Sequence, residues 1–163
     1  MALVIEDGSV VAGANSYTTI AEFAAYLDAR GSFLEGNNGN DEQLLLLAMD
    51  YLESQDFIGD KYSKTQPLQW PRTGVCIDGF SIDEDEIPEI LKSAQIEVAI
   101  AIDSGNNPLS ALDRETKREK VGDIEVEYSD GARDSIELRA VNSILKKLVA
   151  SGAGNSVVQL MRA

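Results

Sequence analysis

The densest group of chemically capable side chains is a run of four acids, Asp83 to Glu86. Carboxylates bind divalent cations, but a calcium loop alternates its oxygen ligands and ends in a distal Glu, a spacing that this run lacks. Acids just before a helix also have a simpler role, because they interact favourably with the positive end of the helix dipole. The run therefore predicts a helix start and no metal site.

Other side chains offer little for catalysis. The chain has no His, which removes the commonest general base and the commonest metal ligand. Its serines then lack a base, and the loop at residues 36–40 lacks the Lys of a phosphate-binding loop. Cys76, the one cysteine, has no metal-ligand set around it in the sequence. We expect no enzymatic activity, no cofactor and a reduced thiol.

The charge is large and uneven. The net charge is −14 over 163 residues, and residues 1–60 hold eleven acids and one base, whereas residues 139–163 hold four bases and no acid. This polarity suits stacking of copies or docking on a partner of opposite sign. The alternative is plain solubility together with the usual basic bias of a last helix. Binding of a polyanion is disfavoured by a surface of this sign.

No feature predicts a membrane or an export signal. No apolar run approaches the roughly 18 residues of a membrane span. Glu6 and Asp7 stand where a secretory signal would carry Lys or Arg. We expect no membrane association.

Helical spacing of apolar residues predicts four helices near residues 19–30, 40–56, 87–104 and 135–150. Thr19 with Glu22, and Asn40 with Gln43, fit capping boxes. Pro88 fits the first position of the third helix. The predicted fold is mainly α, a small four-helix bundle within residues 1–150, with extended N- and C-terminal arms. Residues 1–17 are the N-terminal arm, with a hairpin turn at residues 7–8.

A minor β element is predicted within residues 113–131. Ile124, Val126 and Tyr128 alternate with glutamates, which is typical of a half-buried strand. A single strand must pair with the N-terminal arm or with another copy. We expect a projecting loop or hairpin that faces a neighbouring subunit or a channel lumen, with these side chains at the contact: Lys117, Arg118, Lys120, Ile124, Val126 and Tyr128.

The segment "QWPRTG" places the chain's only Trp at a turn. Trp70 precedes Pro71, so its backbone is extended, and Pro71 cannot donate to a strand ladder. A Trp held there is either a plug of the core or an anchor for a partner. Arg72 keeps the second alternative open, since Trp and Arg are enriched in binding hot spots.

The last segment, residues 151–163, is predicted to be a flexible tail. It begins with small polar residues and ends with too few apolar ones to form a core. Such a tail gains most by adding its backbone to the edge of a partner. The alternative is a frayed terminus. The predicted docking residues are Val157, Val158, Gln159, Leu160, Met161 and Arg162.

Four motifs together carry a resemblance: "ANSYTTIAEFAAYLDARG", "QPLQWPRTGV", "IPEILKSAQIEVA" and "EKVGDIEVEYSDG". In this order the chain resembles the head–tail connector adaptors, or head-completion proteins, of tailed bacteriophages. The resemblance covers residues 6 to about 149.

The resemblance implies a virion protein, assembled in the host cytoplasm, that forms a homo-oligomeric ring, a dodecamer, below the portal protein. The ring would extend the channel for double-stranded DNA and bind a downstream tail or second connector protein. Many relatives carry the label of DnaT-like single-strand DNA-binding proteins, so single-strand DNA binding is the alternative function.

Overall fold

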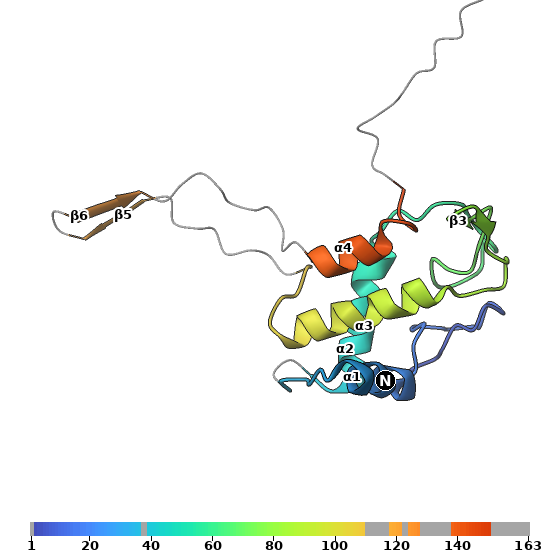
Figure 1. Ribbon diagram of the computed structural model, residues 1–163, viewed down its shortest axis with the longest axis horizontal. Coiled ribbons are helices and arrows are strands. Elements are labelled where there is room, and N and C mark those ends of the chain that lie inside the picture. Colours follow the sequence, from blue (N-terminus) through green and yellow to red (C-terminus); the bar gives the residue numbers. More distant parts are fainter. Residues whose placement is uncertain (1, 37–38, 110–117, 122–123, 128–137, 151–163) are drawn as a thin grey trace, which may run out of the picture.

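The structure is a computed structural model that describes residues 2–36, 39–109, 118–121, 124–127 and 138–150 (Figure 1). In that part of the chain, four helices are found: α1 (Ile20–Arg30), α2 (Asp41–Glu53), α3 (Glu89–Asp103) and α4 (Arg139–Leu145). Six short strands form three antiparallel pairs: β1 (Asp60–Lys61) with β2 (Arg72–Thr73), β3 (Cys76–Ile77) with β4 (Phe80–Ser81), and β5 (Arg118–Val121) with β6 (Ile124–Glu127). None of the described helices is long and apolar enough to cross a bilayer.

The predicted helix starts of α1 and α2 are confirmed by their caps. The Thr19 hydroxyl accepts the N–H of Glu22 at 3.1 Å, and the Glu22 carboxylate accepts the N–H of Thr19 at 2.7 Å. Asn40 and Gln43 make the same reciprocal pair before α2. Gly31 ends α1 in the left-handed conformation, with φ 59°. The residues that set these helix starts therefore lie within three positions of one another in the sequence.

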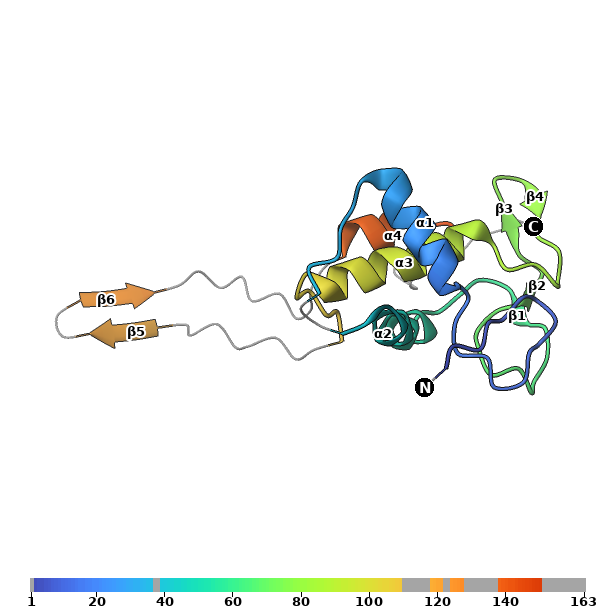
Figure 2. The same cartoon turned by 90° about the horizontal axis from the view of Figure 1, so that it is seen from below.

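The predicted four-helix bundle is wrong. A bundle packs helices of similar length nearly parallel around one seam. Here α2 packs on α3 and α3 packs on α4, but α2 crosses α3 steeply while α1 and α4 lie on either side of α3 (Figures 1 and 2). α1 buries only Phe23, and α4 has seven residues. The fold is helical, with one helix crossing the others.

Much of the core comes from a segment with no helix at all. Between α2 and α3 the chain forms loops and the pairs β1–β2 and β3–β4. Its buried apolar residues join the same cluster as the helices: Phe57, Leu68, Trp70, Val75 and Ile87. A bundle would need only short connections here, so this segment is the main reason that the bundle prediction fails.

The N-terminal segment is also not an extended arm. Glu6 is fully buried, and its carboxylate accepts the N–H groups of Gly8, Val10 and Val11 at 2.9–3.0 Å. The chain thus closes into a loop around a carboxylate, not into the predicted hairpin at residues 7–8. An isolated parallel bridge between Ile5 and Ser16 completes the closure.

The fully buried Gln95 of α3 fastens this loop to the helices. Its amide oxygen accepts the N–H of Tyr17 at 3.0 Å, while its amide nitrogen donates to Ser16 Oγ at 2.8 Å and to the carbonyl of Leu45 at 3.1 Å. One polar side chain therefore links the N-terminal segment, α2 and α3.

The predicted β element exists, but its pairing differs from the prediction. Strand β6 pairs with β5 in register Arg118↔Glu127 to Val121↔Ile124. Its partner is thus the adjacent segment of the same chain, which gives the expected hairpin and not the predicted pairing of a single strand with the N-terminal arm or with another copy. The hairpin lies apart from the helices in both views (Figures 1 and 2).

Candidate functional site

Trp70 lies in the core. Its side chain is fully buried, and its ring meets that of Phe57 edge-on, with centroids 6.0 Å apart and planes at 80°. The peptide bond to Pro71 is cis. The indole Nε1 of Trp70 has no hydrogen-bond partner. Trp70 therefore serves as a core plug, and its surface is not available to a partner.

Arg72 is almost wholly buried and binds backbone carbonyls. Its Nε donates to Ile58 O at 2.8 Å, and its Nη2 donates to Phe57 O at 3.1 Å and to Gly59 O at 2.5 Å. Nη1 reaches Gln69 O at 3.3 Å and Gln69 Oε1 at 3.1 Å. Burial lowers the pKa of Arg72 below its usual value, with nearby acids opposing the shift. The guanidinium thus fixes residues 57–59 from one side.

The residues that follow α4 fix the same segment. Ile58 N–H donates to Leu148 O at 2.9 Å, and Ala150 N–H donates to Asp56 O at 2.7 Å. Phe57 and Val149 form an antiparallel bridge. We call this pairing of residues 148–150 with residues 56–58 the C-terminal bridge. Helix α4 therefore ends at Leu145, and not at residue 150 as predicted.

A second polar network lies beside Trp70. The Tyr17 hydroxyl donates to Glu53 Oε1 at 3.0 Å, and the same oxygen accepts the N–H of Gln69 at 3.0 Å. The backbone N–H of Trp70 donates to the Tyr17 hydroxyl at 3.1 Å. Burial raises the pKa of Glu53 and, with help from the Glu53 charge, raises the pKa of Tyr17 well above its usual range. This network is structural, since every named group has a partner inside the protein.

We expect Glu53→Gln to stabilise the protein at about pH 7 and to have no effect near pH 4.5. The raised pKa means that Glu53 holds its proton more tightly in the folded protein than in the unfolded chain, where its pKa has the ordinary value of 4.5. Its contribution to stability is therefore present below pH 4.5 and is lost as pH rises through the folded pKa. Gln keeps an oxygen for Tyr17 and Gln69 without the charge.

The measurement is urea unfolding of both proteins at the two pH values. Asp50→Asn is the matched control, because it removes the same charge from an exposed position of α2. Equal gains from both variants, or a gain from Glu53→Gln that does not depend on pH, would contradict the burial argument.

The hairpin carries some of the predicted contact residues. Its register places Arg118 opposite Glu127 and Lys120 opposite Glu125. Opposite charges at facing positions favour the pairing of two strands in a hairpin. Ile124 lies opposite Val121, and Val126 opposite Glu119. Lys117, Tyr128 and the predicted docking residues 157–162 lie outside the described residues.

Most basic side chains of the helical body are already engaged. Lys92 bridges Glu22 at 3.0 Å and Glu89 at 3.5 Å, and Lys147 pairs with Asp78 at 2.5 Å. The Arg30 guanidinium lies 3.4 Å from the centre of the Tyr26 ring. With Arg72 buried as well, these side chains form no continuous track for a phosphate backbone over the described part of the chain.

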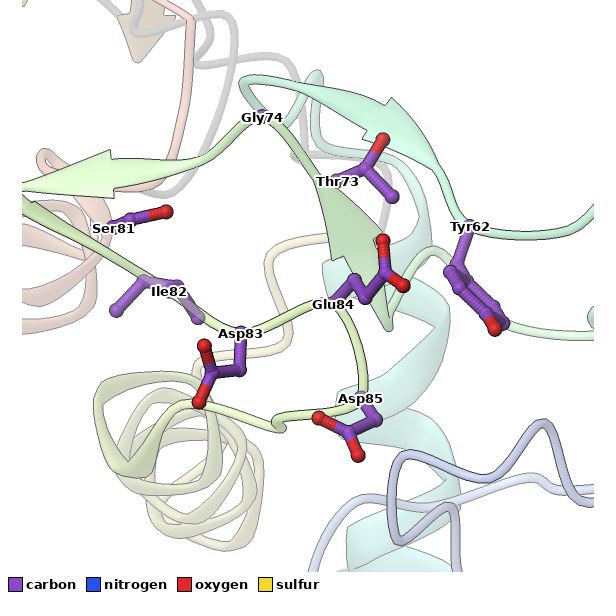
Figure 3. Close-up of a pocket in the computed structure, with 8 residues that line it drawn as sticks. All are labelled: Tyr62, Thr73, Gly74, Ser81, Ile82, Asp83, Glu84 and Asp85. Atoms are coloured by element: carbon purple, nitrogen blue, oxygen red, sulfur yellow. The ribbon is translucent and has the colours of Figure 1, made fainter.

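The acidic run does not converge on a point. Asp83, Glu84 and Asp85 line an open hollow of about 520 Å³ together with Tyr62 and Ser81. The carboxylate of Glu84 points away from those of Asp83 and Asp85 (Figure 3). Among the described residues, no group of three or more His, Cys, Asp or Glu is placed to hold a metal ion.

The β3–β4 hairpin was not predicted from the sequence. Asp78 and Gly79 have φ values of 52° and 88° and connect the paired residues Ile77 and Phe80. An Asp-Gly pair is favoured in such a two-residue turn because both positions need positive φ. The Asp78–Gly79 dipeptide could therefore have predicted this hairpin. The turn presents Phe80 with 76% of its surface exposed.

A family model described as "Putative DnaT-like ssDNA binding protein" matches residues 1–163. No curated protein and no solved structure matches the chain.

Proposed function

Because the chain belongs to the family of DnaT-like single-strand DNA-binding proteins, we propose that it works next to DNA, as a structural adaptor of a tailed bacteriophage. In this proposal a ring of copies, twelve by the resemblance above, sits below the portal and extends the DNA channel. The ring offers an attachment surface to the tail or to a second connector protein. The protein acts in the virion, without catalysis and without a cofactor.

The charge of the molecule is the observation that carries this proposal. The net charge is −14, and the bases Arg72, Lys92 and Lys147 are buried or paired with acids. An acidic wall lets a duplex slide past because like charges repel. A single-strand binder instead needs a basic groove with exposed aromatic side chains, since counterion release supplies most of its affinity.

The elements that reach away from the core support the same role. The β5–β6 hairpin lies apart from the helices (Figure 2). The C-terminal bridge fastens residues 148–150 to the domain, immediately before the segment predicted to dock. A hairpin that lies apart from the helices is suited to contacts with neighbouring subunits or with the portal.

Single-strand DNA binding is the second candidate, and the description of the family favours it. Arg118 and Lys120 would be its phosphate contacts, because the other bases of the described chain are mostly engaged. Phe33 and Phe80, with 89% and 76% of their surfaces exposed, would be its stacking platforms. These groups lie on separate elements and not along one groove.

Titration of a fluorescein-labelled oligothymidine with the full chain separates the two candidates. For the adaptor we expect no change in anisotropy at physiological salt, because the acidic surface opposes binding. Micromolar or tighter affinity that weakens steeply with added salt would establish the second candidate. Loss of that affinity in the variant Arg118→Glu with Lys120→Glu would place the DNA on the hairpin.

Docking onto the portal protein encoded by the same genome tests the adaptor role directly. We expect the full chain to co-sediment with purified portal, and a chain lacking residues 156–163 to lose this binding while keeping its melting temperature. A truncated chain that still docks would contradict the role of the tail. Failure of the full chain to dock would contradict the adaptor function.

A further inference from the structure

The α1–α2 connection presents an aromatic side chain that has no role in the fold. Phe33 has 89% of its surface exposed, more than any other large apolar residue of the described chain. A phenyl ring left in water forgoes the free energy that its burial would contribute. A single exposed apolar residue is ordinary by itself, so the inference depends on how this one is held and on what it fits.

The backbone around Phe33 is fastened on both sides. Ser32 N–H donates to Leu27 O at 3.0 Å, as part of the Gly31 cap of α1. The N–H groups of Glu35 and Gly36 donate to the buried carboxylate of Asp103 at the end of α3, the second at 3.3 Å. We call residues 31–36 the Phe33 loop. It presents its ring on a fixed backbone, so little conformational entropy would be lost on docking.

A hollow of matching size lies beside the C-terminal bridge. Its volume is about 220 Å³, and we call it the α4 hollow; it is lined by Gln55, Asn142, Leu145, Lys146, Val149 and Ala150. Leu145 is buried, whereas Asn142, Lys146 and Ala150 are exposed. A dry cavity of about 150 Å³ is large enough to hold benzene. A phenyl ring therefore fits, with an apolar floor beneath it and polar groups around it.

Phe33 cannot reach the hollow of its own chain. The Phe33 loop precedes the first residue of α2, and Gln55 follows its last residue by two positions. The 13 residues of α2 span about 20 Å. Figure 1 agrees, since the α1–α2 connection and α4 lie on opposite sides of α3. The two features can meet only between two molecules.

The charges of the two surfaces are complementary. Residues 31–42, around the Phe33 loop, contain three acids and no base, whereas residues 139–150, around the α4 hollow, contain three bases and no acid. Glu35 is two positions from Phe33, and Lys146 lines the hollow. Approach of one surface to the other is therefore electrostatically favourable in a protein whose copies otherwise repel each other.

We propose that Phe33 of one copy inserts into the α4 hollow of a second copy, so that copies join head to tail. Because the two surfaces differ, the contact is heterologous and generates a closed ring or an open filament. The inference deepens the proposed function by naming the surfaces through which copies of the adaptor would join.

Two variants with complementary defects test this contact by sedimentation velocity. Phe33→Ser removes the inserted ring but leaves the hollow, and Ala150→Trp fills the hollow but leaves Phe33. Both positions are exposed, so we expect unchanged melting temperatures. The wild type should form species larger than a dimer as concentration rises. Each variant alone should be monomeric, with association weakened by about 30-fold or more, and an equimolar mixture of the two should form a dimer and nothing larger.

Phe80→Ser is the matched control, because it removes the other strongly exposed phenyl ring. It should associate as the wild type does. Equal weakening by Phe80→Ser and Phe33→Ser, undiminished association of Phe33→Ser, or a mixture that stays monomeric would overturn the contact. In those cases an adaptor ring built through other surfaces still stands. A wild type that remains monomeric at every soluble concentration also overturns the contact, while docking on the portal still decides the proposed function.

Discussion

Replacing Trp70 by Ala is expected to lower the free energy of unfolding by about 3–5 kcal/mol. The whole side chain is buried, so its loss removes a large apolar area and leaves a cavity against Phe57. A domain of ordinary stability has about 5–15 kcal/mol in total, so this variant is partly unfolded at modest urea concentrations. Far-UV circular dichroism measures the effect, because the substitution also removes the only Trp fluorophore.

Trp70→Phe is the control for this prediction. A phenyl ring retains part of the contact with Phe57, and it removes an indole N–H that is buried without a partner. We expect a clearly smaller loss than for Ala, since the area lost is offset by relief of the unsatisfied donor. A loss of less than about 0.5 kcal/mol for Trp70→Ala, as at an ordinary surface site, would show that Trp70 does not plug the core.

Replacing Arg72 by Ala is expected to cost about 3 kcal/mol or more. The substitution removes the charged donor that serves the carbonyls of Phe57, Ile58 and Gly59, and each buried acceptor left unpaired costs roughly 1–3 kcal/mol. Because the C-terminal bridge pairs with the same segment, the loss should extend to α4. Urea unfolding gives the size of the effect, and hydrogen exchange at Ile58 and Ala150 gives its location.

Arg72→Lys separates charge from geometry. Lys keeps the positive charge but presents one ammonium in place of a planar fork, and it cannot reach three carbonyls together. We expect it to recover only part of the lost stability and to leave exchange at Ala150 faster than in the wild type. Full recovery by Lys would mean that the charge near Asp60 and Glu53, and not the fork, is what stabilises this region.

The local features of the helices could be predicted from sequence because their causes are local. Thr19 and Glu22 are three residues apart, and so are Asn40 and Gln43, which is all that a capping box requires. The face that α2 buries was harder to predict. Leu47 lies three positions after the buried Leu44, a spacing that predicts burial of both, yet Leu47 is 38% exposed and Met49 is buried. The packing of α2 on α3 decides which face is buried.

The features around the candidate site depend on contacts that sequence spacing does not encode. Arg72 binds carbonyls that lie 13 to 15 positions earlier. Every residue has a backbone carbonyl, so residue types do not show which of them will accept a hydrogen bond from Arg72. The end of α4 was predicted five residues too late because pairing with residues 56–58 overrides its helical propensity. The exposure of Phe33 likewise follows from Asp103, which lies 68 positions from Glu35 and holds the backbone of that loop.

The C-terminal bridge also has a consequence for the order in which the chain folds. It joins Phe57 to Val149, so it closes a loop of 92 residues, whereas the helix caps close within three. Closure entropy grows with loop length, and contacts between distant residues slow folding. During synthesis, α2, the Trp70 turn and α3 emerge before α4, and the carbonyls bound by Arg72 can be in place before residue 148 leaves the ribosome. The bridge is then the last part of the domain to close, so the proposed ring would recruit only chains whose synthesis has passed residue 150.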